Sequence, residues 1–204
     1  MKILISGFEP FGGEKINPAY EAVKSLPDMI DGHEIIKCLV PTAFSNSFDV
    51  LKVYIEKERP DFVISVGQAG GRKGISLERV ALNMMAASIP DNLGYLANDE
   101  IIEKDGPKAY FVDLCYEKML EELKKRDIPV SLSYHAGTFV CNYLMYKTRF
   151  YIEENGLNIG SSFIHVPYIY EQVIDKTDMS YLKLEMIVEG LTLCLKALIK
   201  EKRK

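Results

Sequence analysis

The sequence lacks the features that mark exported or membrane-bound proteins. No run of apolar residues approaches the roughly 20 that a membrane-spanning helix requires, and no Asn-x-Ser/Thr sequon occurs. The first residues read as a strand and carry no charged-then-apolar signal region. These absences predict a cytoplasmic protein with no membrane partner.

Cysteine and histidine are both scarce. The chain has four cysteines and three histidines. No two cysteines form a CxxC pair, and their successive spacings of 77, 26 and 53 residues fit neither a zinc site nor a short disulfide scaffold. We therefore expect reduced thiols, as in a cytosolic protein, and no bound metal.

Charge of one sign is not in excess, because 25 Lys and Arg residues stand against 29 Asp and Glu residues. The net charge of -4 argues against nucleic acid or an anionic membrane as a partner. What the chain has instead is a hydrophobic fraction of 48%. At 204 residues, this composition predicts one domain over residues 1–204 that buries roughly 70% of its unfolded surface.

Short β-rich runs alternate with helical patterns along the whole chain, which predicts an α/β fold. We expect strands near residues 2–6, 34–40, 62–66, 75–82, 130–133 and 162–166, and helices near 18–25, 44–58, 112–126, from 140 onward, and 181–200. Residues 83–106 have neither period and should form a long ordered loop. The predicted architecture is a single-domain α/β/α sandwich with a mostly parallel, twisted central sheet flanked by helices.

Cys141 is the candidate nucleophile. Open α/β sheets bind ligands beyond the carboxyl ends of their strands, and Cys141 falls where a strand has ended and a helix begins. The helix dipole and the unpaired backbone N–H groups there predict a thiol pKa below the free value of about 8.5. The same N–H groups suit an oxyanion. The alternative is that Cys141 is a small buried apolar residue.

His165 is the candidate base, because it lies on a strand that Pro167 closes at the mouth of the sheet. An imidazole there is well placed to take a proton from a neighbouring thiol. A structural core histidine is the alternative. His135, six residues before Cys141, is the second candidate for the base.

Glu78 is the candidate third member. The alternation of residues 75–82 places it on one strand face with Val80 and Leu82, so its carboxylate needs a partner. Orienting a catalytic imidazole supplies one, and an ion pair with Lys73 or Arg79 is the alternative. Asp91, in a turn, is a second candidate for this role.

The glycine-rich residues 67–74 match neither the GxxxxGK[ST] nor the GxGxxG phosphate-binding pattern. Glycines instead allow a backbone to approach a small ligand closely, with Gln68 as a polar contact. Phe8 and Phe11, in the first loop, are either apolar walls for that ligand or lids over the core.

Five blocks of sequence span nearly the whole chain: residues 7–14 with 17–18, 67–72 with 78–81, 89–92, 136–142 and 163–167. In order and spacing they resemble the type I pyroglutamyl peptidases, also called pyrrolidone-carboxylate peptidases, a family of cysteine peptidases. One position departs from the pattern. Ser88 stands where the family usually has an arginine before Ile-Pro-Asp-Asn.

The resemblance implies hydrolysis of the bond after an N-terminal pyroglutamyl residue, with Cys141 as nucleophile, His165 as base and Glu78 orienting the base. It implies that the lactam ring is surrounded by Phe8, Phe11, Thr42, Ile89, Phe139 and Val140, with Gln68 on the polar side. It also implies a cytoplasmic enzyme that needs no cofactor, is commonly a homotetramer, and has pyroglutamyl peptides as partners.

Two other functions stay open at this point. Ser88 motivates an inactive or weakly active binder of cyclised N-termini, and the thiol of Cys141 motivates a redox sensor. The position of Cys194 on the apolar stripe of the last predicted helix suits either the core or a subunit interface.

Overall fold

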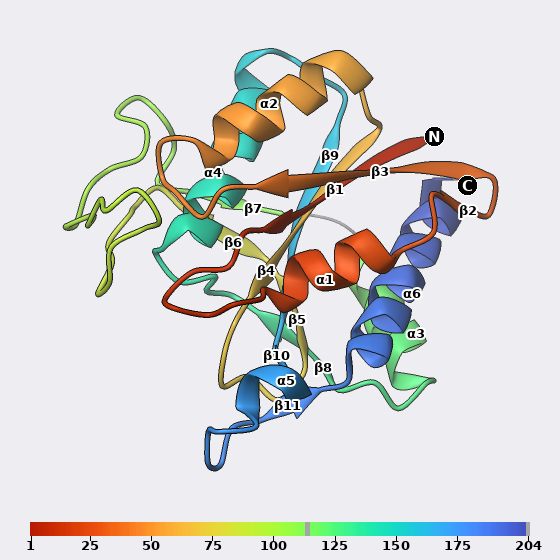
Figure 1. The fold of residues 1–204 in the computed structure, drawn as a ribbon. Helices are drawn as coiled ribbons and strands as arrows, with labels where there is room; N and C mark the ends of the chain where they lie inside the picture. The colour runs from red at the N-terminus through yellow and green to blue at the C-terminus, as the bar shows by residue number, and fades with distance from the viewer. Residues whose placement is uncertain (113–114, 203–204) are drawn as a thin grey trace.

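A central sheet covered by helices on both faces forms the body of the molecule (Figure 1). The structure is a computed structural model and describes residues 1–112 and 115–202. Seven strands form the sheet, in the order β2 (Met29–Ile30), β3 (His33–Val40), β1 (Lys2–Phe8), β4 (Phe62–Gln68), β9 (Gly160–Val166), β5 (Ile75–Glu78) and β8 (Val130–Ser133). This arrangement confirms the predicted α/β sandwich.

Strand direction changes at both ends of the sheet. Strands β3, β1, β4 and β9 are parallel to one another, and β2 pairs with β3 antiparallel. At the other end, β5 runs antiparallel to β9, and β8 is parallel to β5. The sheet is therefore mostly parallel, but its last two strands run against the other long strands.

The central strands are buried on both faces, which explains their continuous apolar runs. All seven residues of β4 are buried, as are the last six of β1. Two of the polar side chains within them pair with each other, since the Ser6 hydroxyl donates to Ser65 Oγ at 2.9 Å. These strands carry the functional loops at their carboxyl ends.

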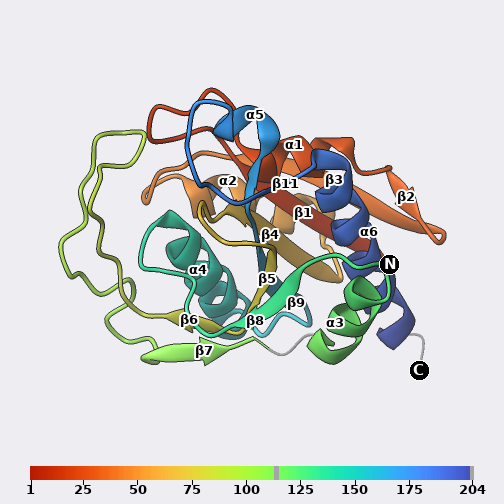
Figure 2. The same cartoon turned by 90° about the horizontal axis from the view of Figure 1, so that it is seen from below.

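Two groups of helices cover the sheet (Figures 1 and 2). Helices α1 (Pro18–Ser25) and α3 (Tyr116–Lys124) both pack against α6 (Leu184–Lys202), and α2 (Ser47–Glu58) packs against α4 (Val140–Glu154). The start of α1 is set locally, because the Asn17 side chain accepts a hydrogen bond from the backbone N–H of Ala19 at 3.0 Å. No helix within the described residues has the length and apolar content to cross a bilayer.

Helix ends differ from the sequence predictions by a few residues. Helix α2 begins at Ser47 rather than near residue 44, and α3 is shorter than the predicted 112–126, of which residues 113–114 lie outside the described residues. Helix α6 begins at Leu184 rather than 181, because β11 (Tyr181–Leu182) pairs with β10 (Tyr168–Ile169). The short helix α5 (Tyr170–Val173) follows β10 and was not predicted.

The prediction of one strand over residues 75–82 was wrong. The chain leaves the main sheet at Arg79, and β6 (Val80–Leu82) pairs antiparallel with β7 (Ala109–Phe111) in a separate two-stranded sheet. The backbone of Arg79 explains the break, because its N–H donates to Ser133 O and its carbonyl accepts from Val112 N, both at 2.8 Å. Glu78 therefore does not share a strand face with Val80 and Leu82.

The segment 83–106 projects from the body of the molecule, as both views show (Figures 1 and 2). An isolated bridge between Met85 and Glu100 ties its two arms together. Its exposed apolar side chains are Met84, Ile89, Leu93, Tyr95, Leu96 and Ile101. The segment 83–106 contains no helix or named strand, which confirms the expected bounds of the long loop.

All four cysteines are free thiols. Cys194 is 0% exposed and belongs to the hydrophobic core. Of the two positions that the sequence left open for Cys194, the core is the one observed.

Gly7 allows α1 to lie directly on β1. A Cβ at this position would lie 2.6 Å from Tyr20 Cα and 2.8 Å from Tyr20 N, both backbone atoms that move only with the helix. We expect Gly7→Ala to lower the free energy of unfolding by about 1–3 kcal/mol, the usual cost of overpacking, as measured by urea denaturation. The exposed Val53→Ala on α2 is the control and should change it by less than about 0.5 kcal/mol. Equal stability of Gly7→Ala and wild type would contradict this close contact.

Candidate active site

A cavity of about 250 Å³ lies at the carboxyl ends of β4 and β9, where the first loop and the start of α4 meet. Seven of the residues proposed from the sequence line it: Phe8, Phe11, Thr42, Gln68, Phe139, Cys141 and His165. Asn17, Ala69, Arg72 and residues 135–137 complete the lining. The fold thus brings together side chains from five separated parts of the sequence.

Two of the proposed pocket residues do not line this cavity. Ile89 is 42% exposed on the projecting segment, with its Cδ1 3.8 Å from the position that a Cβ on Gly12 would occupy. Val140 is fully buried at the first position of α4.

His165 and Glu78 form a buried hydrogen bond, with His165 Nδ1 and Glu78 Oε1 2.8 Å apart. Because β5 is antiparallel to β9, Glu78 lies opposite Phe163 and His165 opposite Ser76. The two side chains are thus diagonal neighbours on one sheet face. With Nδ1 engaged by the carboxylate, Nε2 is the ring nitrogen left for proton exchange.

Cys141 is the second residue of α4, and its sulfur lies over the backbone of Gly67. A Cβ on residue 67 would be 2.8 Å from Cys141 Sγ and 2.9 Å from the Phe163 ring, so only glycine leaves room for the thiol in this position. The next residue, Asn142, anchors the helix start, because its amide accepts from Leu82 N at 2.8 Å and donates to Leu82 O at 2.9 Å.

The predicted lowering of the Cys141 pKa was wrong. Burial, followed by the negative charge of Glu78, raises the pKa of Cys141 to about 12, although Arg72 opposes this rise. Burial also lowers the pKa of His165, against the opposing hydrogen bond with Glu78. Burial disfavours the charged form of each group, so the thiol and the imidazole that line this cavity are both neutral at pH 7.

Arg72 is the residue that sequence reasoning missed. Its Nη1 lies 2.5 Å from Glu78 Oε1, and its Nη2 donates to the backbone carbonyl of His135 at 3.2 Å. The sequence argument had considered Lys73 and Arg79 as cations beside Glu78. The sequence did indicate that the buried carboxylate of Glu78 needs a cation. Choosing Arg72 as that cation requires knowing how residues 69–74 fold back over β5.

Glu78 remains ionised because its neighbours outweigh its burial. Burial alone would raise the pKa of this carboxyl, but hydrogen bonding with His165 and Arg72 brings it below its usual value. The carboxylate therefore accepts from both neighbours through the same oxygen, Oε1.

The two second candidates have other roles. His135 is exposed at the rim, where its Nδ1 accepts from Gly137 N at 2.9 Å. Asp91 holds the turn of the projecting segment, because its two oxygens accept from the backbone N–H groups of Phe44, Leu93 and Tyr95, each at 2.9 Å. Neither has a hydrogen bond with His165 within the described residues.

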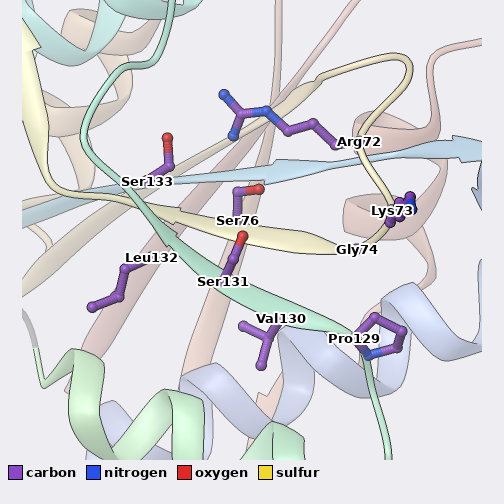
Figure 3. Close-up of a pocket in the computed structure, with 9 residues that line it drawn as sticks. All are labelled: Arg72, Lys73, Gly74, Ser76, Pro129, Val130, Ser131, Leu132 and Ser133. Carbon is purple, nitrogen blue, oxygen red and sulfur yellow. The ribbon is translucent and has the colours of Figure 1, made fainter.

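A second, more open cavity of about 410 Å³ lies along β5 and β8, next to Arg72 (Figure 3). The hydroxyls of Ser76, Ser131 and Ser133 lie on the sheet face over which the Arg72 side chain extends (Figure 3). Arg72 lines both cavities. Across the described ranges 1–112 and 115–202, no group of three or more His, Cys, Asp or Glu residues could hold a metal ion.

The chain is similar to known proteins over nearly its whole length. It is 50% identical over 201 residues to a pyrrolidone-carboxylate peptidase of Thermosipho africanus, covering 98% of each chain. It is 53% identical over 196 residues to the corresponding protein of Brachyspira hyodysenteriae, covering 96% of this chain and 98% of that one.

Solved structures agree with these relatives. The pyroglutamyl peptidase I of Bacillus amyloliquefaciens superposes with a TM-score of 0.93 at 43% identity, covering 97% of this chain and 94% of that one. A mutant pyrrolidone carboxyl peptidase of the hyperthermophile Pyrococcus furiosus gives a TM-score of 0.95 at 40% identity, with 98% and 99% coverage. The sequence model of the pyroglutamyl peptidase family matches residues 1–201. The chain therefore belongs to the pyroglutamyl peptidase family, as its sequence blocks had indicated.

Proposed function

We propose that this chain hydrolyses the bond after an N-terminal pyroglutamyl residue, with Cys141 as nucleophile, His165 as general base and Glu78 orienting the imidazole. One observation carries this assignment of roles: the buried hydrogen bond between His165 and Glu78 lies beside the only one of the four cysteines that lines the same cavity. Membership of the pyroglutamyl peptidase family supports the substrate class.

The reaction has two halves, each with His165 as the proton carrier. As Cys141 Sγ attacks the pyroglutamyl carbonyl carbon, His165 Nε2 takes the thiol proton, and backbone N–H groups at the start of α4 stabilise the oxyanion. The imidazolium then gives its proton to the leaving amine as the C–N bond breaks, which leaves a thioester. Water, deprotonated by His165, attacks this thioester, and the thiol is regenerated with release of pyroglutamate.

The neutral resting pair suits this sequence of steps. With the pKa of Cys141 raised and that of His165 lowered, no ion pair is formed before the substrate arrives. Charge develops on His165 only during attack, next to the Glu78 carboxylate that is already in place. Arg72 balances this carboxylate in the resting enzyme.

The pocket matches the chemistry of a pyroglutamyl group, which has no free α-amine and is neutral. Phe8, Phe11 and Phe139 supply apolar walls, and Thr42 and Gln68 supply polar atoms. A cavity of about 250 Å³ has room for a five-membered lactam ring but not for a longer peptide. We assign Ile89 to the rim of the pocket and Val140 to the buried first turn of α4.

We also propose that the domain of residues 1–204 assembles as a homotetramer in the cytoplasm. The exposed apolar side chains of the segment 83–106 support self-association, and four free thiols suit a reducing compartment. No observation favours a redox sensor, because a thiol with its pKa raised to about 12 forms little thiolate at neutral pH.

The assignment of nucleophile and base is tested by release of a chromophore from a pyroglutamyl amide. We expect Cys141→Ala and His165→Ala each to lower kcat by roughly a thousandfold or more, because each removes a group that takes part in bond formation or proton transfer. The control, His135→Ala, should retain most of the activity. Turnover by Cys141→Ala would exclude Cys141 as the nucleophile, and wild type without turnover would favour an inactive binder.

Arg72 should set the acid limb of the pH profile. A base with a lowered pKa stays neutral at lower pH, so the wild-type limb in kcat/KM should lie below the ordinary histidine value of about 6.5. Arg72→Met removes a positive charge that disfavours the imidazolium and frees Glu78 to stabilise it. The pKa of His165 then rises, and the limb should move to higher pH.

The measurement is kcat/KM from about pH 4 to 9 for wild type, Arg72→Met and Arg72→Lys. Arg72→Lys keeps the charge and should stay closer to the wild-type limb than Arg72→Met does. If the limb of Arg72→Met stays in place or moves to lower pH, Arg72 does not tune the base.

A further inference from the structure

Two buried glutamines from distant parts of the chain meet behind the substrate cavity. Gln68 ends β4, and Gln172 lies in α5, the short helix after β10. Gln172 Nε2 donates to Gln68 Oε1 at 2.9 Å, and both side chains are buried. Of the two, only Gln68 lines the cavity.

The orientation of the Gln172 amide is fixed by the backbone N–H of Ile169, which can act only as a hydrogen-bond donor. This N–H donates to Gln172 Oε1 at 3.3 Å. The NH2 end of Gln172 must therefore point the other way. Two further acceptors agree with this, since Nε2 lies 3.4 Å from Ile16 O and 3.5 Å from Glu14 Oε2.

The orientation of Gln172 in turn dictates that of Gln68. Facing an NH2 group, Gln68 must present its carbonyl oxygen, so its own NH2 is directed away from Gln172. Among the described residues, Gln68 Nε2 has no hydrogen bond to the protein, and the side chain borders the cavity. Gln68 thus presents a hydrogen-bond donor, its NH2 group, to the cavity.

A hydrogen-bond donor at this place matches one atom of the substrate. The pyroglutamyl ring differs from the prolyl ring by its lactam carbonyl, which accepts hydrogen bonds. A pocket with an oriented donor rejects a ring that leaves this donor unpaired. This reasoning rests on the proposed function, which supplies the lactam.

We propose that Gln172 is a positioning residue for substrate specificity: it locks the Gln68 amide so that its NH2 group faces the cavity and donates to the lactam carbonyl. The order of donors and acceptors runs from Ile169 N–H through Gln172 to Gln68 and ends at the substrate. A backbone amide outside the cavity thereby determines which ring the pocket accepts.

The segment that carries Gln172 is held against the first loop by other contacts. Lys176 forms an ion pair with Glu14 of that loop. Within its own segment, Lys176 lies 4.5 Å from the centroid of the Tyr168 ring. These contacts do not involve Gln68, so a substitution at residue 172 can reverse the amide without detaching α5.

The deciding substitution is Gln172→Glu. A carboxylate accepts from Ile169 N–H with one oxygen and offers its other oxygen to Gln68, which must then rotate and donate. The Gln68 carbonyl oxygen now faces the cavity and repels the lactam carbonyl. We expect KM for a pyroglutamyl amide to rise by about tenfold or more, with kcat nearly unchanged, because ring binding is lost equally in ground state and transition state.

Three variants separate this effect from other causes. Gln172→Met removes the lock without reversing it, so it should raise KM less than Gln172→Glu does. The double variant Glu14→Gln with Gln172→Glu removes the nearby like charge and should keep the rise in KM relative to Glu14→Gln alone, which accounts for the lost ion pair with Lys176. Glu171→Gln, on the exposed side of the same helix, should match wild type.

Binding of the bare lactam 2-pyrrolidone, followed by calorimetry, gives a readout without chemistry. Its dissociation constant should rise in the same order as KM. If wild type turns over the amide but Gln172→Glu keeps both wild-type values, or loses kcat alone, this inference is overturned while the proposed function stands. If wild type itself shows no turnover, the proposed function fails.

Discussion

The site depends on one buried carboxylate. Glu78 is 0% exposed, and an unpaired charge at such depth would cost several kcal/mol. Its Oε1 accepts from His165 and from Arg72, so one oxygen orients the imidazole and neutralises the buried charge. The same guanidinium reaches the carbonyl of His135, which ties the loop before Cys141 to the strand that carries Glu78.

The direction of β5 makes this arrangement possible. In an all-parallel sheet the side chains at strand ends share one edge, but β5 runs against β9, so its last residue lies inside the sheet, opposite Phe163. Glu78 therefore reaches His165 from the neighbouring strand β5, whereas Cys141 lies at the start of α4. The chain then leaves the sheet at Arg79, which keeps β6 free to anchor α4 through Asn142.

Periodicity in the sequence was sufficient for the strands and helices that bury apolar faces, as in β1, β4 and α6. It failed at Arg79, where hydrogen bonds of the backbone to Ser133 and Val112 end the strand. Such backbone hydrogen bonds do not change the alternation of polar and apolar residues. The dipole argument at Cys141 failed because the depth of burial is a property of the folded chain. Four residues of α5 are too few to show a period, so Gln172 could not be found.

In the proposed mechanism, no net charge is present in the site before the thiol attacks the substrate. In the resting state the Glu78 and Arg72 charges cancel, the thiol and imidazole are neutral, and the proposed ligand is neutral. The first new charges arise when the thiol proton moves to His165, where Glu78 is already hydrogen-bonded to Nδ1. An interaction that strengthens only as the imidazolium forms stabilises the transition state more than the bound substrate, and this difference is what raises kcat.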